Sequence, residues 1–156
     1  MLVISACLTA LMMSLIEFIV FGAFMLASGM LPPWTIILFP IVLGVEFILA
    51  LGVSLIISSL NVIWRDVQWI WPVVMQAGFF LTPVMYSMDT FKGIPESWVL
   101  KYNPMGAVLD SLRYILMSRP APILTDLGYA GILAIVIITA GWRIFNKLEP
   151  RFGEEV

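Results

Sequence analysis

The stretch Asn61-Val62-Ile63-Trp64-Arg65-Asp66-Val67 places an adjacent pair of opposite charges between two long apolar segments. Residues 35–60 contain one charged residue, Glu46, and residues 67–88 contain none. Charged side chains are costly in lipid and are favoured where a chain emerges at the membrane surface. The stretch therefore predicts a turn between two membrane spans, although any loop needs polar residues and the pair alone is equally well explained in that way. The residues assigned to this turn are Asn61, Arg65 and Asp66.

The composition of the whole chain supports a membrane protein. Of 156 residues, 62% are hydrophobic and 12% are charged, whereas soluble domains carry roughly 25% charged residues. Helices satisfy their own backbone hydrogen bonds, which is why they can cross lipid. We therefore predict an all-α integral membrane protein that forms a single transmembrane domain over residues 1–156.

Four apolar segments are candidates for spans, each of which needs about 20 residues. They cover about residues 2–29, 35–59, 67–86 and 127–145. Residues 87–126 are too polar to span the membrane and too apolar for a free loop. We expect two short re-entrant or interfacial helices there, at about 95–102 and 104–117, and a tail outside the membrane at 146–156.

Four spans would place both termini on the same side of the membrane. Basic residues are enriched in cytoplasmic loops close to the ends of spans. The two sides carry equal numbers, namely Arg65, Arg143, Lys147 and Arg151 against Lys92, Lys101, Arg113 and Arg119. The rule gives most weight to basic residues in short loops close to span ends, and this weighting favours cytoplasmic termini.

Several classes of function find no support in the sequence. The net charge is −2, so no basic surface suits nucleic acid. The chain contains no histidine and a single cysteine, Cys7, so it has no internal disulfide and lacks the commonest metal ligand. A phosphate-binding loop of the GxxxxGK[ST] type is also absent. We therefore expect no catalytic residue, metal or cofactor in this chain, and no enzyme activity.

Two carboxylates, Glu17 and Glu46, fall inside the first and second predicted spans. A carboxylate in lipid is costly, so it commonly belongs to a proton relay, an ion site or the polar wall of a path. The alternative is that each is protonated or bonded to a neighbouring helix.

The side chains that share a helical face with Glu46 and Glu17 do not decide between a functional and a structural role. Residues at steps of four share one helical face, and one such face carries Glu46, Ala50, Ser54 and Ser58. Small polar faces are typical of close helix packing and also suit the wall of a path. A second face carries Glu17, Phe21, Phe24 and Ser28, whose aromatic stripe is more typical of a bundle core.

Aromatic residues gather around residues 87–126. Their rings can stack on sugars, or they can form the aromatic belt found at membrane interfaces. Composition favours neither interpretation. The candidates for a sugar path are Tyr86, Trp98, Tyr102 and Tyr114.

Four sequence motifs, in a fixed order along the chain, resemble those of one protein family. They are NVIWRDV at 61–67, FFLTPVMY at 79–86, KYNPMGAVLDSLRYIL at 101–116 and FNKLEPRFGEEV at 145–156. This order and spacing resemble the membrane subunits of type-2 ABC exporters, specifically the polysaccharide-export permeases that move O-antigen, capsule or teichoic-acid chains. Members of that family have six spans, and this chain resembles the last four, so it corresponds to an incomplete permease.

The resemblance implies a partner and a topology. The complete exporter would contain two permeases and two ATPase subunits, with ATP and Mg²⁺ bound to the ATPases. The permease would lie in the cytoplasmic (inner) membrane, with both termini and the Arg65 turn in the cytoplasm. A lipid-linked glycan would pass between the permeases. The candidate path residues are Glu17, Glu46, Tyr86, Trp98, Tyr102 and Tyr114.

Three other functions remain open at this point. An ABC exporter for drugs or lipids would share the same architecture. A small carrier coupled to ions or protons would use Glu17 and Glu46 and would need no ATPase. A membrane fragment without transport activity is the remaining alternative.

Overall fold

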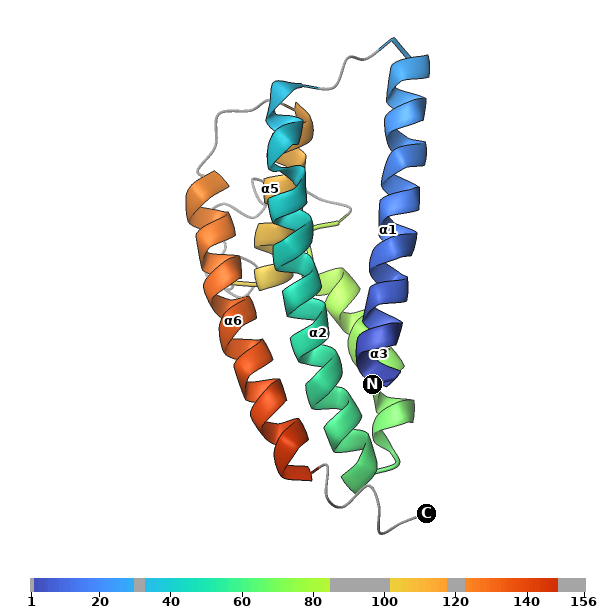
Figure 1. The fold of residues 1–156 in the computed structure, drawn as a ribbon, viewed down its shortest axis with the longest axis vertical. Coiled ribbons are helices and arrows are strands. Elements are labelled where there is room, and N and C mark those ends of the chain that lie inside the picture. The colour runs from blue at the N-terminus through green and yellow to red at the C-terminus, as the bar shows by residue number, and fades with distance from the viewer. Residues whose placement is uncertain (1, 30–32, 85–101, 118–122, 149–156) are drawn as a thin grey trace.

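The computed structural model describes residues 2–29, 33–84, 102–117 and 123–148. Within these ranges the chain forms helices joined by turns, without a strand, and the helices lie side by side as a bundle (Figure 1). The all-α prediction is therefore confirmed for the described residues. Three helical segments there are long and apolar enough to cross a membrane, namely Val3–Ala27, Trp34–Ile63 and Ile123–Leu148.

The first two of these segments follow the predicted spans closely. Helix α1 covers Leu2–Ala27 and ends next to Gly29, whose φ of 77° is the left-handed conformation that glycine adopts at helix ends. A short 3-10 helix, η1 (Trp34–Leu38), leads directly into α2 (Phe39–Ile63). The second apolar segment thus extends four residues beyond its predicted end.

The third predicted span, 67–86, is longer than the helix found there. Helix α3 covers Val67–Leu81, which at 1.5 Å per residue is about 22 Å and shorter than a bilayer core. Thr82 already has an extended backbone, with φ −94° and ψ 131°, because the proline that follows it disfavours the helical conformation. The helix therefore ends five residues before the predicted end of this span, and residues 85 and 86 lie outside the described part of the chain.

Helix α5 (Pro104–Met117) occupies the same residues as one of the two short helices predicted between the third and fourth spans. Its re-entry into the membrane stays a prediction, and the other predicted helix, at 95–102, lies largely outside the described residues. Val108 and Ile115 of α5 are fully buried against Val42 of α2 and Ala130 of α6. The Thr35 hydroxyl of η1 donates a hydrogen bond to the Ile115 carbonyl oxygen at 2.6 Å. Helix α5 is thus an integral part of the bundle.

The pairing of α2 with α6 (Ile123–Leu148) is the most extensive helix contact in the described part of the chain. A Cβ added to Gly52 would lie 2.7 Å from the backbone nitrogen of Ile138, and one added to Gly141 would lie 2.7 Å from the carbonyl oxygen of Gly52. The two backbones therefore touch where only glycine leaves room. Small residues commonly permit such close approach between membrane helices.

The direction of the helices brings three points in the chain to one end of the bundle. The start of α1, the turn between α2 and α3, and the end of α6 all lie towards the lower end in Figure 1. This arrangement agrees with the predicted topology, in which both termini and the Arg65 turn share one side of the membrane. The identity of that side stays a prediction.

Candidate functional site

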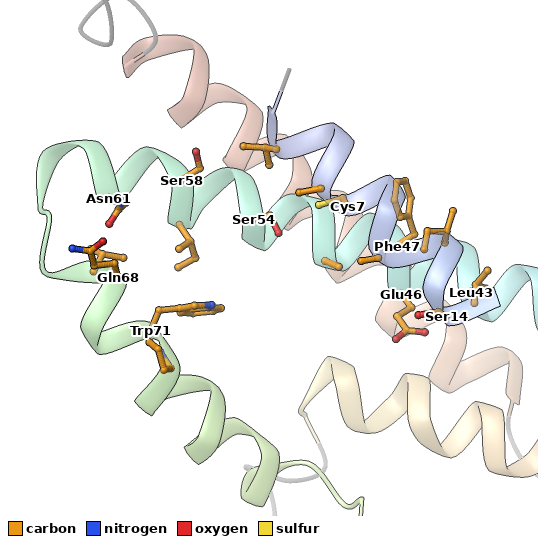
Figure 2. Close-up of a pocket in the computed structure, with 18 residues that line it drawn as sticks. Cys7, Ser14, Leu43, Glu46, Phe47, Ser54, Ser58, Asn61, Gln68 and Trp71 are labelled. Carbon is orange, nitrogen blue, oxygen red and sulfur yellow. The ribbon is translucent and has the colours of Figure 1, made fainter. Parts of the chain in front are cut away.

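A cavity of about 610 Å³ lies between α1, α2 and α3, and we call it the α1–α2–α3 cavity (Figure 2). Helix α2 forms its longest wall, while the first half of α1 and the start of α3 form the others. Its lining combines apolar side chains with polar groups that carry no charge except for one carboxylate. The polar side chains are Ser14, Glu46, Ser54, Ser58, Asn61 and Gln68.

The face of α2 that carries Glu46, Ala50, Ser54 and Ser58 is turned towards this cavity, since all four line it. The prediction that they share a face is confirmed. Among the described residues, however, this face does not make the close helix contact that its small residues suggested. That contact uses Gly52, which lies two positions away from Ala50 and Ser54 and therefore about 200° around the helix.

Asn61 belongs to the last turn of α2 and not to the loop, which corrects the predicted turn. Its side chain lines the α1–α2–α3 cavity, and its Oδ1 atom is buried without a hydrogen-bond partner in the described part of the chain. The Trp64 N–H still donates to Leu60 O at 2.9 Å, so the helix runs past the asparagine. The residue type could not indicate this, because asparagine is also common in turns.

The turn itself is short and lies at the surface. It consists of Trp64, Arg65 and Asp66, all of them exposed. The Val67 N–H donates to the Trp64 carbonyl oxygen at 3.1 Å, and Asp66 O then accepts from Ile70 N at 3.1 Å as α3 begins. Arg65 and Asp66 therefore lie in the turn, as predicted from their charges.

The second carboxylate, Glu17, is exposed on α1 and does not line the cavity that Glu46 lines. The structure therefore does not bring the two carboxylates together in one site. Phe24 of the same predicted face is 67% exposed, so the aromatic stripe is not a bundle core in this chain. The ring that packs is Phe18, which stacks on Phe39 of α2 with centroids 3.5 Å apart.

Of the four aromatic path candidates, Tyr86 and Trp98 lie outside the described residues. Tyr102 is 59% exposed immediately before α5, and its ring meets that of Tyr129 edge-on at 6.3 Å. The Tyr129 hydroxyl donates to the Tyr102 carbonyl oxygen at 2.7 Å, which ties α6 to the start of α5. Tyr114 is half-buried on α5. Neither described tyrosine lines the α1–α2–α3 cavity.

Asn103 connects two of the four sequence motifs, the one at 79–86 and the one at 101–116. Its Nδ2 group donates to Leu81 O at 3.2 Å and to the Thr82 hydroxyl at 3.1 Å, at the end of α3. Its Oδ1 atom accepts from the Met105 N–H at 3.0 Å, at the start of α5. One amide therefore fastens the end of one helix to the beginning of the next.

A second contact strengthens this junction. The Arg113 guanidinium of α5 donates to Val84 O at 2.8 Å and lies 3.4 Å from the Asp110 carboxylate. Pro83, which follows the end of α3, is fully buried. The Thr-Pro-Val and Asn-Pro phrases thus form one structural junction, which linear spacing does not reveal because the two lie about 20 residues apart.

These observations define a class of protein. Three of the described helical segments are apolar and long enough to span a membrane, and the cavity between α1, α2 and α3 is lined by apolar and polar side chains with one carboxylate. Within the described ranges, no cluster of three or more His, Cys, Asp or Glu side chains suits a metal ion. The chain is a multi-pass α-helical membrane protein.

Curated relatives then identify the family. The chain is 33% identical over 141 residues to the O-antigen export system permease protein RfbA of Klebsiella pneumoniae, covering 85% of this chain and 51% of that protein. It is 29% identical over 132 residues to the protein of the same name from Myxococcus xanthus, covering 84% of this chain and 51% of that one. The chain is thus a relative of O-antigen export permeases, and the predicted resemblance to the polysaccharide-export permeases of type-2 ABC exporters is confirmed.

The match has a defined extent. The chain spans about half the length of the curated relatives it matches. No protein-family profile and no solved structure matches it.

Proposed function

We propose that this chain is part of the membrane-spanning permease of an ATP-driven exporter that moves a polysaccharide or lipid-linked glycan across the cytoplasmic membrane. The observation that carries the proposal is its relationship to O-antigen export permeases over 84–85% of its length. Its helices, which are long and apolar enough to cross a membrane, agree with such a role.

Energy for export comes, in this proposal, from a separate ABC ATPase subunit that binds ATP and Mg²⁺. Two permeases and two ATPases form the exporter, with the termini and the Arg65 turn facing the ATPases in the cytoplasm. The exposed Arg65 and Asp66 side chains are available for such a contact. ATP binding would bring the ATPases together and rock the permeases apart, opening a path for the glycan between them.

Four aromatic residues are the proposed contacts of the sugar chain. Tyr102 suits this role because its ring is largely exposed while its backbone is held by Tyr129. Stacking on such a ring needs no charge and tolerates different sugars. Tyr86, Trp98 and Tyr114 complete the proposed set.

A complementation experiment tests the function. In a strain that lacks the Klebsiella pneumoniae relative, a chimera carries these 156 residues in place of the matched region of that relative. We expect the chimera to restore O-antigen at the cell surface, seen as a lipopolysaccharide ladder on a gel. No ladder, despite a membrane level of chimera equal to that of the parent, would contradict the proposal.

A proton-coupled carrier is the second candidate, because Glu46 lines the cavity within a membrane helix. Purified chain in liposomes distinguishes the two functions. Uptake of a substrate driven by a pH gradient alone, without ATP or an ATPase, would favour the carrier over the exporter.

A further inference from the structure

The charge of the α1–α2–α3 cavity is one-sided. Among the described residues that line it, Glu46 is the only charged one, and no lysine or arginine is present. Arg65 lies in the adjacent turn, but its side chain is exposed and does not line the cavity. Within the described residues Glu46 forms no ion pair. The cavity thus offers a negative group without a positive partner.

A second acceptor in the cavity also lacks a partner. The Asn61 Oδ1 atom is buried and accepts no hydrogen bond within the described part of the chain. On the packed side of α2, by contrast, the fully buried Ser59 hydroxyl donates to the Leu55 carbonyl oxygen at 2.7 Å. A buried acceptor without a donor costs free energy, and the acyl chain of a lipid supplies no donor. The cavity therefore favours an occupant that carries hydrogen-bond donors.

The rest of the lining is largely small and apolar. Ala6 and Ala10 of α1 and Ala50 of α2 line the cavity, and Phe47 and Trp71 add two aromatic rings. Its volume of about 610 Å³ falls within the range of about 300–1,000 Å³ that is typical of small-molecule sites. Such walls suit the apolar body of an amphiphile, whereas a sugar chain would leave most of its hydroxyl groups without partners.

The two acceptors lie towards opposite ends of the cavity (Figure 2). Helices α1 and α2 run in opposite directions (Figure 1), and Phe18 stacks on Phe39 with centroids 3.5 Å apart. Glu46 lies about two turns after Phe39 and therefore comes near this stack. Asn61 is about 22 Å further along α2, next to the turn. A group bound at Glu46 thus leaves the length of the cavity for the body of the ligand.

We propose that the α1–α2–α3 cavity binds a hydrophobic amine in its protonated form. The ammonium group donates to the Glu46 carboxylate, and the apolar body extends along the alanines towards Trp71. Opposite charges attract strongly where water is scarce, and a hydrogen bond between two ions is roughly twice as strong as a neutral one. A neutral or anionic amphiphile of the same length gains neither. A ligand with a second donor at its far end would also satisfy Asn61.

Cys7 provides a reporter for this site, because it lines the cavity and is the only cysteine in the chain. The purified chain is placed in lipid nanodiscs, and the rate of Cys7 modification by N-ethylmaleimide is followed by intact-protein mass spectrometry. The probe is N,N-dimethyldodecylamine at neutral pH, where it is cationic. Its uncharged isostere 2-methyltetradecane and the anion tetradecanoate, at the same ratio to lipid, are the matched controls.

We expect the amine to slow the modification of Cys7 about tenfold when it occupies about nine sites in ten, because only empty sites react. The isostere and the anion should leave the rate unchanged. In a Cys7→Ser chain, Thr139→Cys on α6 places the thiol at an exposed position that does not line the cavity. The amine should not protect that thiol.

Substitutions of the two membrane carboxylates assign the effect to Glu46. Glu46→Gln should abolish protection, and Glu46→Asp, which keeps the charge, should retain part of it. Glu17→Gln should keep full protection, since Glu17 lies in an apolar helix but does not line the cavity. An unchanged modification rate without amine, together with unchanged circular dichroism, shows that each variant is folded.

Four results would each overturn the proposal: no protection by the amine, equal protection by its isostere, protection that survives in Glu46→Gln, or protection that is lost equally in Glu17→Gln. The readout requires neither export nor an ATPase. Protection of Cys7 in a chain whose chimera fails to restore O-antigen would therefore contradict the proposed function and leave the amine site supported.

Discussion

At the scale of single residues, the structure separates groups that look alike in the sequence. Glu17 and Glu46 are both carboxylates within apolar helices, yet only Glu46 lines the α1–α2–α3 cavity. Gly44 and Gly52 both lie in α2, yet only Gly52 touches another backbone. The side of the helix on which a residue lies, and what that side meets, decides its role.

Gly52→Ala should destabilise the bundle by about 1–3 kcal/mol, the usual cost of forcing atoms into a packed interior. The added Cβ would lie 2.7 Å from a backbone atom of α6, which cannot move as the end of a side chain can. Gly44→Ala is the control, because a Cβ there meets nothing within 4 Å. Denaturant unfolding in detergent micelles, followed by circular dichroism, measures both, and equal stabilities would contradict the prediction.

Glu46→Gln should preserve export in the chimera, because glutamine keeps the shape of the side chain and a polar group in the α1–α2–α3 cavity. Glu46→Leu should lower export, since it removes that polar group. The amount of surface O-antigen, normalised to chimera in the membrane, is the measurement. Loss of export in Glu46→Gln would instead indicate a role for charge, with Glu17→Gln as the comparison outside the cavity.

At the scale of elements, the two proline-containing motifs meet at the junction between α3 and α5. Thr82-Pro83 ends α3, and Asn103-Pro104 begins α5. Proline suits a first helical turn, where its missing N–H is not needed. Asn103 then fastens the two helix ends together, so the junction holds α5 at a fixed place in the bundle.

Asn103→Ala should loosen this junction, since it removes three hydrogen bonds, at a cost of about 0.5–1.5 kcal/mol. We expect faster amide hydrogen exchange at Val84 and Met105. Amides in the middle of the α2–α6 pair should be unaffected. Asn146→Ala, at an exposed position on α6, is the control. Unchanged exchange at both amides would show that Arg113 and the buried Pro83 suffice.

At the scale of the whole molecule, the described helices form a membrane bundle that matches half of a larger relative. The α2–α6 pair and α5 form its well-packed part, whereas α1 and α3 border an open cavity. The packing of the described bundle is therefore uneven, with its core on the side of α5 and α6.

The topology of the whole chain gives a direct prediction. In a variant with Cys7→Ser, a single cysteine at Arg65 should react with a membrane-impermeant maleimide only from the cytoplasm. A single cysteine at Tyr102, 59% exposed near the start of α5, should react only from the opposite side. Labelling of intact cells and of inverted vesicles measures this, and reaction of both from one side would show that residues 67–101 do not cross the membrane.

Residue order along the chain was enough to predict an all-α membrane protein, its long apolar segments, the surface turn at Arg65 and the resemblance to polysaccharide-export permeases. These follow from composition and from local order along the chain, because lipid imposes helices on long apolar segments. The folded structure was needed to show that Glu46 and not Glu17 lines the cavity, that Asn61 is in α2, and that Asn103 joins α3 to α5. It also showed that Gly52 makes the close contact expected of the Ala50–Ser54 face. The physical reason is that helical periodicity shows which residues share a face, whereas the neighbour that covers each face depends on contacts between distant parts of the chain.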